Sequence, residues 1–413
     1  PRLAMDVELL WDFLMETQEE TMDYLLKKLS KETIINLINT EIVKGGFLFA
    51  LKEGVFIENK QLRLLYRKPA TSFNEKAVQQ YQANRLSVIE EVVYEEDDRI
   101  DLVIFINGLA LFAIELKFNP NGQSVQDAIK QLKDRNPKNR LFRFEQGVLA
   151  SFAVDTLEVY MTTQLKGQET YFLPFNMGKG EGIETGSGNP HNPDGVDTEY
   201  LWLDVLTMDS ILQLVESFIF YEVDKSNSKK KTLIFPRYHQ RRAVSRLLED
   251  MKTNHTDNNY LIQHSAGSGK TNTIAWLAHS LVSLHDDQNR NIVDTVLIVT
   301  DRIVVDRQLQ DAVRQINHKN GVVKVMGDRE TSSDLADAIA GNTKIIATTI
   351  HKFAQINQSD WMSVGSTANK KFAILIDEAH SSTTGSYMSS VSQVLTETDT
   401  ENGTIDEIQE VTV

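Results

Sequence analysis

Two groups of residues in this sequence have types and spacings that could do chemistry. The first is the segment His264-Ser-Ala-Gly-Ser-Gly-Lys270-Thr271, which combines glycines with a lysine and a hydroxyl side chain. Such a loop can close its backbone N–H groups around phosphate oxygens, while the lysine reaches the outer phosphates and the hydroxyl binds Mg²⁺. The second group is Asp101, followed by Glu115-Leu-Lys117. Two carboxylates can hold Mg²⁺ beside a scissile phosphate, and a lysine can stabilise the charge that develops there.

The residues around the first group predict a strand, a glycine loop and a helix, in that order. The apolar run 260–263 precedes the loop, and the segment from residue 273 onward has the spacing of an amphipathic helix. His264 stands where the GxxxxGK[ST] pattern has its first glycine, but the rest of the pattern is complete. We therefore predict that ATP is bound by Gly267, Ser268, Gly269, Lys270 and Thr271, with Thr271 on the Mg²⁺.

A later acidic motif fits the same site. The apolar run 371–376 predicts a buried parallel strand that ends at Asp377-Glu378-Ala379-His380. There Asp377 can hold Mg²⁺ while Glu378 polarises the attacking water. Two more predicted strands, 294–300 and 343–350, and a helix over 304–316 indicate a doubly wound parallel sheet.

The second group lies on a predicted β-hairpin, because two apolar strands in residues 100–117 surround Asn107-Gly108. Glu115 and Lys117 share one strand face, but the face of Asp101 depends on the turn. A regular two-residue turn pairs Asp101 with Ile114 and turns it away from Glu115. A three-residue turn, with Gly108 left-handed, pairs Asp101 with Ala113 and turns all three polar side chains to one side. Because a shared metal site requires that arrangement, we predict the three-residue turn or an equivalent bulge.

Composition limits the possible classes of protein. The 413 residues are 41% hydrophobic and 24% charged, an ordinary globular balance that predicts two to three domains. The absence of cysteine excludes disulfides and cysteine zinc sites. A net charge of −15 argues against nucleic-acid binding over the whole surface, so DNA would need local positive tracks. No segment resembles a signal peptide or a membrane span, and we expect a cytoplasmic protein.

The motifs of the second half resemble those of superfamily 2 helicase-like translocases, and more closely the motor subunit of type I restriction enzymes. The resemblance rests on Gln240, HxxGSGKT, Thr300-Asp301-Arg302, Thr348-Thr-Ile-His-Lys-Phe353 and DEAH. It implies that Gln240 contacts adenine and that His380 links the ATP site to a second motor lobe. It also implies that Arg302, Thr349 and Lys352 lie along the DNA track. As alternatives, Gln240 is a plain surface residue, and Arg302 and Lys352 are solvated charges.

The first half resembles the PD-(D/E)XK nucleases through Asp101, Glu115 and Lys117. The type I motor subunits have such a domain before the motor, with a glutamine on the helix after the ExK strand, and Gln131 matches that place. The resemblance therefore implies a catalytic role for all four residues. The tyrosine that often follows this glutamine is not matched, because Arg135 stands four residues after Gln131. An upstream glutamate is also common in this class, with Glu75 and Glu90 as candidates.

These observations predict an α/β chain with two folded parts. We expect a helical start over 1–60, a mixed-sheet restriction-endonuclease-like domain over 61–224, a linker over 225–231 and a RecA-like P-loop lobe over 232–413. No Ser-Ala-Thr element or second-lobe arginine motif follows His380. We therefore expect this stretch to bind ATP but to hydrolyse it, and to translocate, poorly on its own.

The resemblance implies ATP-dependent DNA translocation coupled to Mg²⁺-dependent double-strand cleavage. The implied partners are double-stranded DNA and the methyltransferase and specificity subunits of a type I restriction-modification complex. Two alternatives stay open. One is a superfamily 2 ATPase whose D…ExK hairpin is only structural, and the other is a non-catalytic module that docks to the methyltransferase and specificity subunits.

Overall fold

The computed structural model describes residues 3–69, 73–96, 98–179, 187–224, 227, 230–254, 259–265, 267–300, 307–316, 322–327, 329–355, 370–377 and 409–411. The chain divides into two compact units, Pro1–Tyr238 and His239–Val413. Two strands of the first unit, β9 (Phe220–Val223) and β10 (Lys231–Ile234), pair with each other, and most of the expected linker 225–231 lies outside the described residues. The division between the units therefore comes later in the chain than the expected linker.

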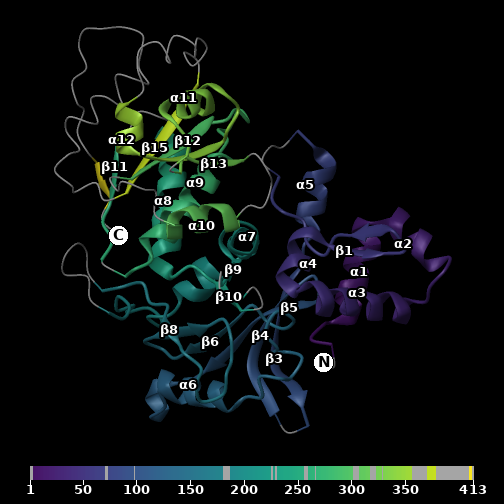
Figure 1. Cartoon of the computed structure of the whole chain (residues 1–413). Helices are drawn as coiled ribbons and strands as arrows, with labels where there is room; N and C mark the ends of the chain where they lie inside the picture. Colours follow the sequence, from purple (N-terminus) through teal and green to yellow (C-terminus); the bar gives the residue numbers. More distant parts are fainter. Residues whose placement is uncertain are drawn as a thin grey trace. The chain divides into compact units, whose positions relative to one another are not determined.

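Four helices open the first unit (Figure 1): α1 (Val7–Thr17), α2 (Glu19–Leu26), α3 (Lys31–Gly45) and α4 (Phe47–Glu53). Side-chain caps define two of their starts, because Asp6 accepts from the backbone N–H of Leu9 and Ser30 from that of Thr33. Their apolar faces are buried, and they lie within the helical start expected over 1–60. No single described helix is long and apolar enough to cross a membrane, although α3 and α4 pass that test as a pair bent by 113°.

A six-stranded mixed sheet forms the centre of the first unit. Its strand order is β3-β4-β5-β6-β7-β8, with β5 and β6 parallel and the other neighbours antiparallel. The strands are β3 (Leu86–Glu95), β4 (Asp98–Ile106), β5 (Leu109–Leu116), β6 (Ala150–Val154), β7 (Val159–Thr162) and β8 (Leu173–Pro174). Helix α6 (Val125–Asp134) packs on β5, β6 and β7. A mixed sheet in an α/β unit agrees with the predicted fold class.

The two faces of this sheet bury different side chains. On the α6 face, Val103, Phe105 and Ala113 join Ala128 and Leu132 of the helix in one buried cluster. On the other face, the rings of Phe112, Phe152 and Phe175 meet Phe235, which follows β10, at centroid distances of 6.0 to 6.1 Å. The remaining described elements of the unit are β1 (Val55–Ile57), β2 (Lys60–Leu62), α5 (Glu75–Gln82), η1 (Asn119–Asn121), η3 (Leu201–Val205), α7 (Met208–Gln213) and η4 (Leu214–Phe218).

The turn between β4 and β5 is a regular two-residue turn. Asn107 and Gly108 both have positive φ, 50° and 78°, as a type I′ turn requires, and Ile106 pairs with Leu109. The predicted three-residue turn is therefore wrong. The physical reason is the contact that Asn107 makes with a neighbouring segment. Asn107 is fully buried and its side chain donates to the Leu64 carbonyl at 3.0 Å, which holds this residue in the turn.

A bulge lies further along β5, however. Phe105 pairs with Ala110 but Ile104 pairs with Phe112, so Leu111 has no partner on β4. Beyond the bulge Leu102 pairs with Ile114, and the same register carried one residue further places Asp101 opposite Glu115. The equivalent bulge that the hairpin prediction allowed is thus confirmed, and it brings the two carboxylates to one face.

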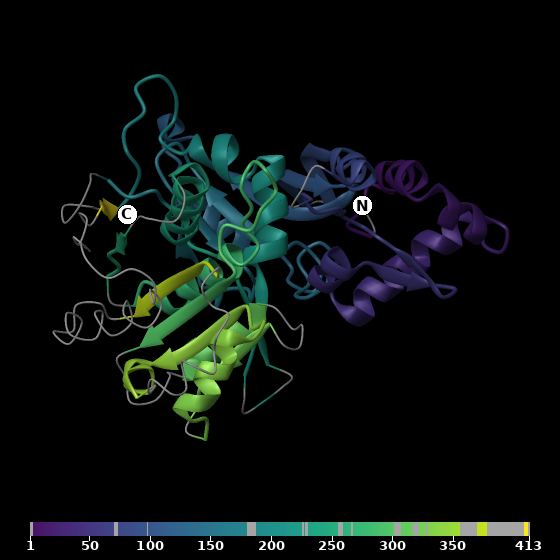
Figure 2. The ribbon, with the colours of Figure 1, turned by 90° about the horizontal axis from the view of Figure 1, so that it is seen from above.

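The second unit contains a four-stranded sheet in which all neighbours are parallel, in the order β13-β14-β12-β15. Figure 2 shows these strands side by side in green to yellow. The strands are β12 (Thr295–Thr300), β13 (Val323–Val325), β14 (Ile345–Thr349) and β15 (Phe372–Asp377). β11 (Tyr260–Ile262) pairs in parallel with β16 (Gln409–Val411). The helices in the described part of this unit are α8 (Tyr238–Asn254), α9 (Lys270–Leu281), α10 (Arg307–Ile316), α11 (Ser332–Ala340) and α12 (Ile350–Ala354).

The turn provides a test of how tightly the hairpin is held. A Cβ atom on Gly108 would overlap the carbonyl oxygen of Asp6 and lie 2.6 Å from the backbone nitrogen of Leu10. Gly122 has nearly the same φ, +79°, but open space around it. The backbone strain of alanine at such a φ is roughly 1–2 kcal/mol at either position. We expect Gly108→Ala to lower the free energy of unfolding by more than about 3 kcal/mol, because the clash adds to the strain.

Urea unfolding of both variants measures this difference. Gly122→Ala serves as the matched control, since it carries the strain without the clash. Equal losses of stability in the two variants would contradict the tight packing of the turn against the first helix.

Candidate functional site

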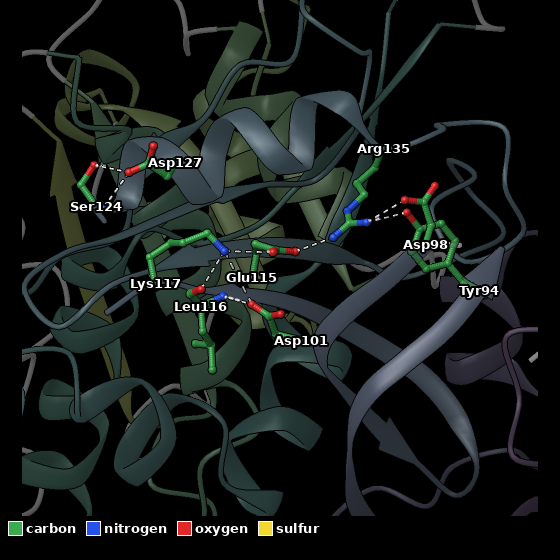
Figure 3. Close-up of polar contacts among 9 residues, drawn as sticks. All are labelled: Tyr94, Asp98, Asp101, Glu115, Leu116, Lys117, Ser124, Asp127 and Arg135. Atoms are coloured by element: carbon green, nitrogen blue, oxygen red, sulfur yellow. Dashed lines mark hydrogen bonds and ion pairs between the residues drawn. The ribbon is translucent and has the colours of Figure 1, made fainter. Parts of the chain in front are cut away.

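Asp101, Glu115 and Lys117 lie together on the α6 face of the hairpin, and we name them the carboxylate cluster (Figure 3). The ammonium of Lys117 is 3.2 Å from Glu115 Oε1 and 3.9 Å from Asp101 Oδ2. The backbone N–H of Leu116 donates to Asp101 Oδ2 at 2.7 Å, which fixes that carboxylate against β5. The side chain of Glu115 is 0% exposed, that of Lys117 10% and that of Asp101 30%. The cluster therefore opens toward solvent on its Asp101 side.

A fourth charged residue at this place was missed by the sequence analysis. Arg135, the C-cap of α6, is buried, and its Nη2 donates to Glu115 Oε2 at 3.0 Å. Its Nη1 donates to the Tyr94 hydroxyl at 3.0 Å and to Asp98 Oδ1 at 3.3 Å. The sequence held only one signal, an arginine where the related nucleases often have a tyrosine. Its contact with Glu115 depends on where α6 ends, which spacing alone does not determine.

Burial and the neighbouring charge of Asp101 raise the pKa of the Glu115 carboxyl. Arg135 and Lys117 act in the opposite direction, since each favours the ionised form. The ionised carboxylate is a buried charge that would be costly without partners. Each of its two oxygens has its own cation, Lys117 on Oε1 and Arg135 on Oε2.

The donor set of the cluster fits Mg²⁺. Mg²⁺ prefers oxygen ligands, and proteins usually hold it through one or two carboxylates together with several waters. Asp101 and Glu115 supply two such carboxylates on one face. In the described part of the chain no group of three or more His, Cys, Asp or Glu residues could hold a metal ion. A metal here would thus depend on these two carboxylates and on water.

The other residues predicted for this site are not part of the cluster. Gln131 lies half-buried on α6, and its side chain forms no hydrogen bond among the described residues. Glu75 is an exposed residue at the start of α5. Glu90 is exposed on β3 and pairs with Leu102, which puts it on the face opposite to Asp101. Neither glutamate forms a hydrogen bond or ion pair with the cluster within the described ranges.

The glycine loop of the second unit has the predicted order of strand, loop and helix. β11 ends at Ile262, and α9 begins at Lys270 after Gly269, which is left-handed with φ 86°. The first turn of a helix presents free N–H groups and the positive end of its dipole, which together attract anions. Lys270 Nζ lies 3.6 Å from Asp377 Oδ1, at the end of β15. From the described residues that buried oxygen accepts no hydrogen bond, as suits an atom that could meet a cation bound near Thr271.

Three polar side chains hold the loop from its sides. Gln240, on α8, donates to the carbonyl of Gly269 at 2.9 Å and is only 4% exposed, so it is not a plain surface residue. The His239 ring lies 3.2 Å from the Ser268 carbonyl oxygen, and His264 Nδ1 lies 3.1 Å from Ser268 Oγ. His264, which replaces the usual first glycine, thus supports the loop by contacting its serine.

Some predicted residues lie outside the described ranges, namely Arg302, Glu378 and His380. Of the other two predicted DNA contacts, Thr349 is buried at the end of β14. The ammonium of Lys352, on α12, donates to the carbonyl of Gly327. Their contact with DNA remains a prediction.

Comparison with known proteins matches each unit to a family. Residues 8–170 match the type I restriction enzyme R protein N terminus, and residues 239–400 match the SWI2/SNF2 ATPase family. The type I restriction enzyme MjaVIIIP endonuclease subunit of Methanocaldococcus jannaschii is 25% identical over 96% of this chain and 37% of its own length. The SauCOLORF180P endonuclease subunit of Staphylococcus aureus is 26% identical over 73% of this chain and 30% of its own length.

An R-protein N-terminal domain followed by a SWI2/SNF2-type ATPase domain defines the class of this protein. These matches together support an R subunit of a type I restriction enzyme. The chain spans about a third of the length of the relatives it matches.

The loop histidine has a pH-dependent consequence for stability. Burial, followed by the charges of His239 and Lys270, lowers the pKa of His264 to about 4 from its ordinary value of 6.5. The folded unit resists protonation of His264, whereas the unfolded chain accepts the proton below pH 6.5. Stability from this residue is therefore present above pH 6.5 and is lost as the pH falls toward 4.

We expect His264→Asn to reduce the loss of stability of the second unit between pH 7.5 and 5 by on the order of 2 kcal/mol. Urea unfolding at the two pH values measures it. His285→Asn, in the loop after α9, is the matched control for the same substitution outside the glycine loop. An unchanged pH slope in His264→Asn would contradict the burial of this ring.

Proposed function

We propose that this protein cleaves double-stranded DNA at the carboxylate cluster with Mg²⁺, and that ATP bound at the glycine loop drives translocation of the DNA. The observation that carries the proposal is the meeting of Asp101, Glu115 and Lys117 on one face of the bulged hairpin. The mixed sheet supports a restriction-endonuclease-like fold, and the parallel sheet with its glycine loop supports a RecA-like, doubly wound lobe. The R-subunit relatives support methyltransferase and specificity subunits as partners.

The cluster divides the work of phosphodiester hydrolysis among its side chains. Bound Mg²⁺ would supply a polarised water and charge neutralisation at the phosphate. Asp101 and Glu115 would hold it, and the Leu116 N–H keeps Asp101 in place. Lys117 lies within 4 Å of both carboxylates and would stabilise negative charge as it builds on the phosphate oxygens. Gln131 remains a predicted contributor from α6.

At the glycine loop, the chain's own residues indicate how ATP would be bound. The N–H groups at the start of α9 would face the phosphates, with Lys270 beside them. Gln240 is positioned against the loop, where it could read the base. Asp377 and Thr271 would share the Mg²⁺, and Glu378 remains the predicted residue for activating water.

Substitutions in the carboxylate cluster distinguish a catalytic role of the hairpin from a purely structural one. We expect Asp101→Ala or Lys117→Ala to lower Mg²⁺-dependent plasmid cleavage by roughly 100-fold or more, because each removes charge that acts in the transition state. ATP binding should stay at the parent level. Cleavage is measured with the complete protein, its partner subunits, ATP and Mg²⁺.

Asp134→Asn, an exposed residue at the end of α6, is the matched control and should cleave normally. Parent-level cleavage by both Asp101→Ala and Lys117→Ala would remove the nuclease assignment and leave the hairpin as structure.

The glycine loop is tested independently of cleavage. We expect Lys270→Ala to weaken binding of a fluorescent ATP analogue by roughly 10- to 100-fold, since a charge-assisted contact to phosphate is lost. Lys252→Ala, an exposed substitution near the end of α8, is the control. Equal analogue binding by Lys270→Ala and the parent, or no binding by either, would favour the non-catalytic docking module.

A further inference from the structure

Among the described residues, Arg135 alone places a positive charge beside the Oε2 oxygen of Glu115. Lys117 approaches Glu115 from the side of Asp101, where the cluster is open to solvent. Arg135 approaches from the end of α6 and contacts the other carboxylate oxygen, Oε2. The two cations therefore have different positions relative to a ligand that enters beside Asp101.

The guanidinium is itself held in place. Tyr94 and Asp98 accept hydrogen bonds from Nη1, while Nη2 donates to Glu115. The two ends of the planar group therefore have separate partners. The guanidinium carbon also lies 5.5 Å from the centre of the Tyr94 ring, within the range of a cation–π contact. A planar group anchored in this way can orient a carboxylate, which a single flexible ammonium does less well.

We propose that Arg135 is a positioning residue of the nuclease site, which holds Glu115 through Oε2 so that Oε1 is the oxygen presented to the metal ion. This inference rests on the proposed nuclease function. Without Arg135, Lys117 would be the one cation left to Glu115, and the carboxylate would be free to turn both oxygens toward it. A metal ion would then have to compete with the ion pair between Lys117 and Glu115. It would also have to fix the orientation of the carboxylate on binding.

Binding of Mn²⁺, used as the probe in place of Mg²⁺, tests the proposal without relying on activity. It is measured on the complete protein by electron paramagnetic resonance, and the nuclease-site signal is the part that Asp101→Asn removes. We expect Arg135→Met to raise the Kd of this site by about tenfold or more, because an oriented, charge-assisted contact is lost. Arg135→Lys, which keeps the charge, should recover most of the affinity.

Cleavage gives a second readout. The Mg²⁺ concentration for half-maximal cleavage should rise in Arg135→Met by a similar factor, with a smaller change in the rate at saturating Mg²⁺. A merely structural role would lower both the rate and the melting temperature without this separation.

Arg140→Met is the matched control, because Arg140 is partly buried in the same unit but bonds to Asn39 and to the carbonyl of Gln146. It should leave the Mn²⁺ affinity unchanged. If Arg135→Met does not fold, Arg135→Gln removes the charge while keeping an N–H donor, and the same weakening is expected.

The outcomes separate this inference from the proposed function. Unchanged or tighter Mn²⁺ binding in a folded Arg135 variant that lacks the charge would overturn the role of Arg135 alone. Absence of any Asp101-dependent Mn²⁺ site and of cleavage in the parent would overturn the proposed nuclease, and this inference with it.

Discussion

The alternation of side chains along a β-strand is the constraint on which the carboxylate cluster depends. A shift of one residue in the pairing of β4 with β5 moves Asp101 to the opposite face from Glu115. Leu111 supplies that shift as a bulge, three residues after the tight turn at Asn107-Gly108. The turn cannot supply it, because Asn107 is bonded to Leu64 and Asn84 and Gly108 lies against the first helix. The extra residue is therefore accommodated within the strand.

The tight turn at Asn107-Gly108 links the N-terminal helices to the carboxylate cluster. The backbone N–H of Asp6 donates to the Gly108 carbonyl at 2.7 Å, and the Asp6 side chain also caps α1. The same residue therefore starts the helix and secures the turn. The other end of the hairpin carries the charges, where Asp101, Glu115 and Lys117 meet. A rigid turn at one end keeps the register at the other, so the helical segment supports the site without contributing a side chain to it.

Much of this arrangement could be predicted from the sequence, and the exceptions have physical causes. The apolar runs predicted β4, β5, β12, β14 and β15, because a buried strand needs a continuous apolar segment. The position of the bulge could not be predicted, since it depends on tertiary contacts of Asn107 with residues far away in the chain. Arg135 was missed for a similar reason. Its role follows from the end of α6 meeting β5, and a buried arginine shows its partner only in the folded structure.

The two sites share an electrostatic feature that the separate motifs do not reveal. In each, a lysine is close to a carboxylate expected to bind Mg²⁺: Lys117 beside Glu115 at 3.2 Å and Lys270 beside Asp377 at 3.6 Å. A carboxylate paired with an ammonium is a weaker ligand for a divalent cation than a free one, because the cation must first displace or share that partner. Under the proposed function, the displaced lysine would then be available to the phosphate that arrives with the metal. Metal and substrate would thus favour each other's binding, since each would relieve a cost that the other meets alone.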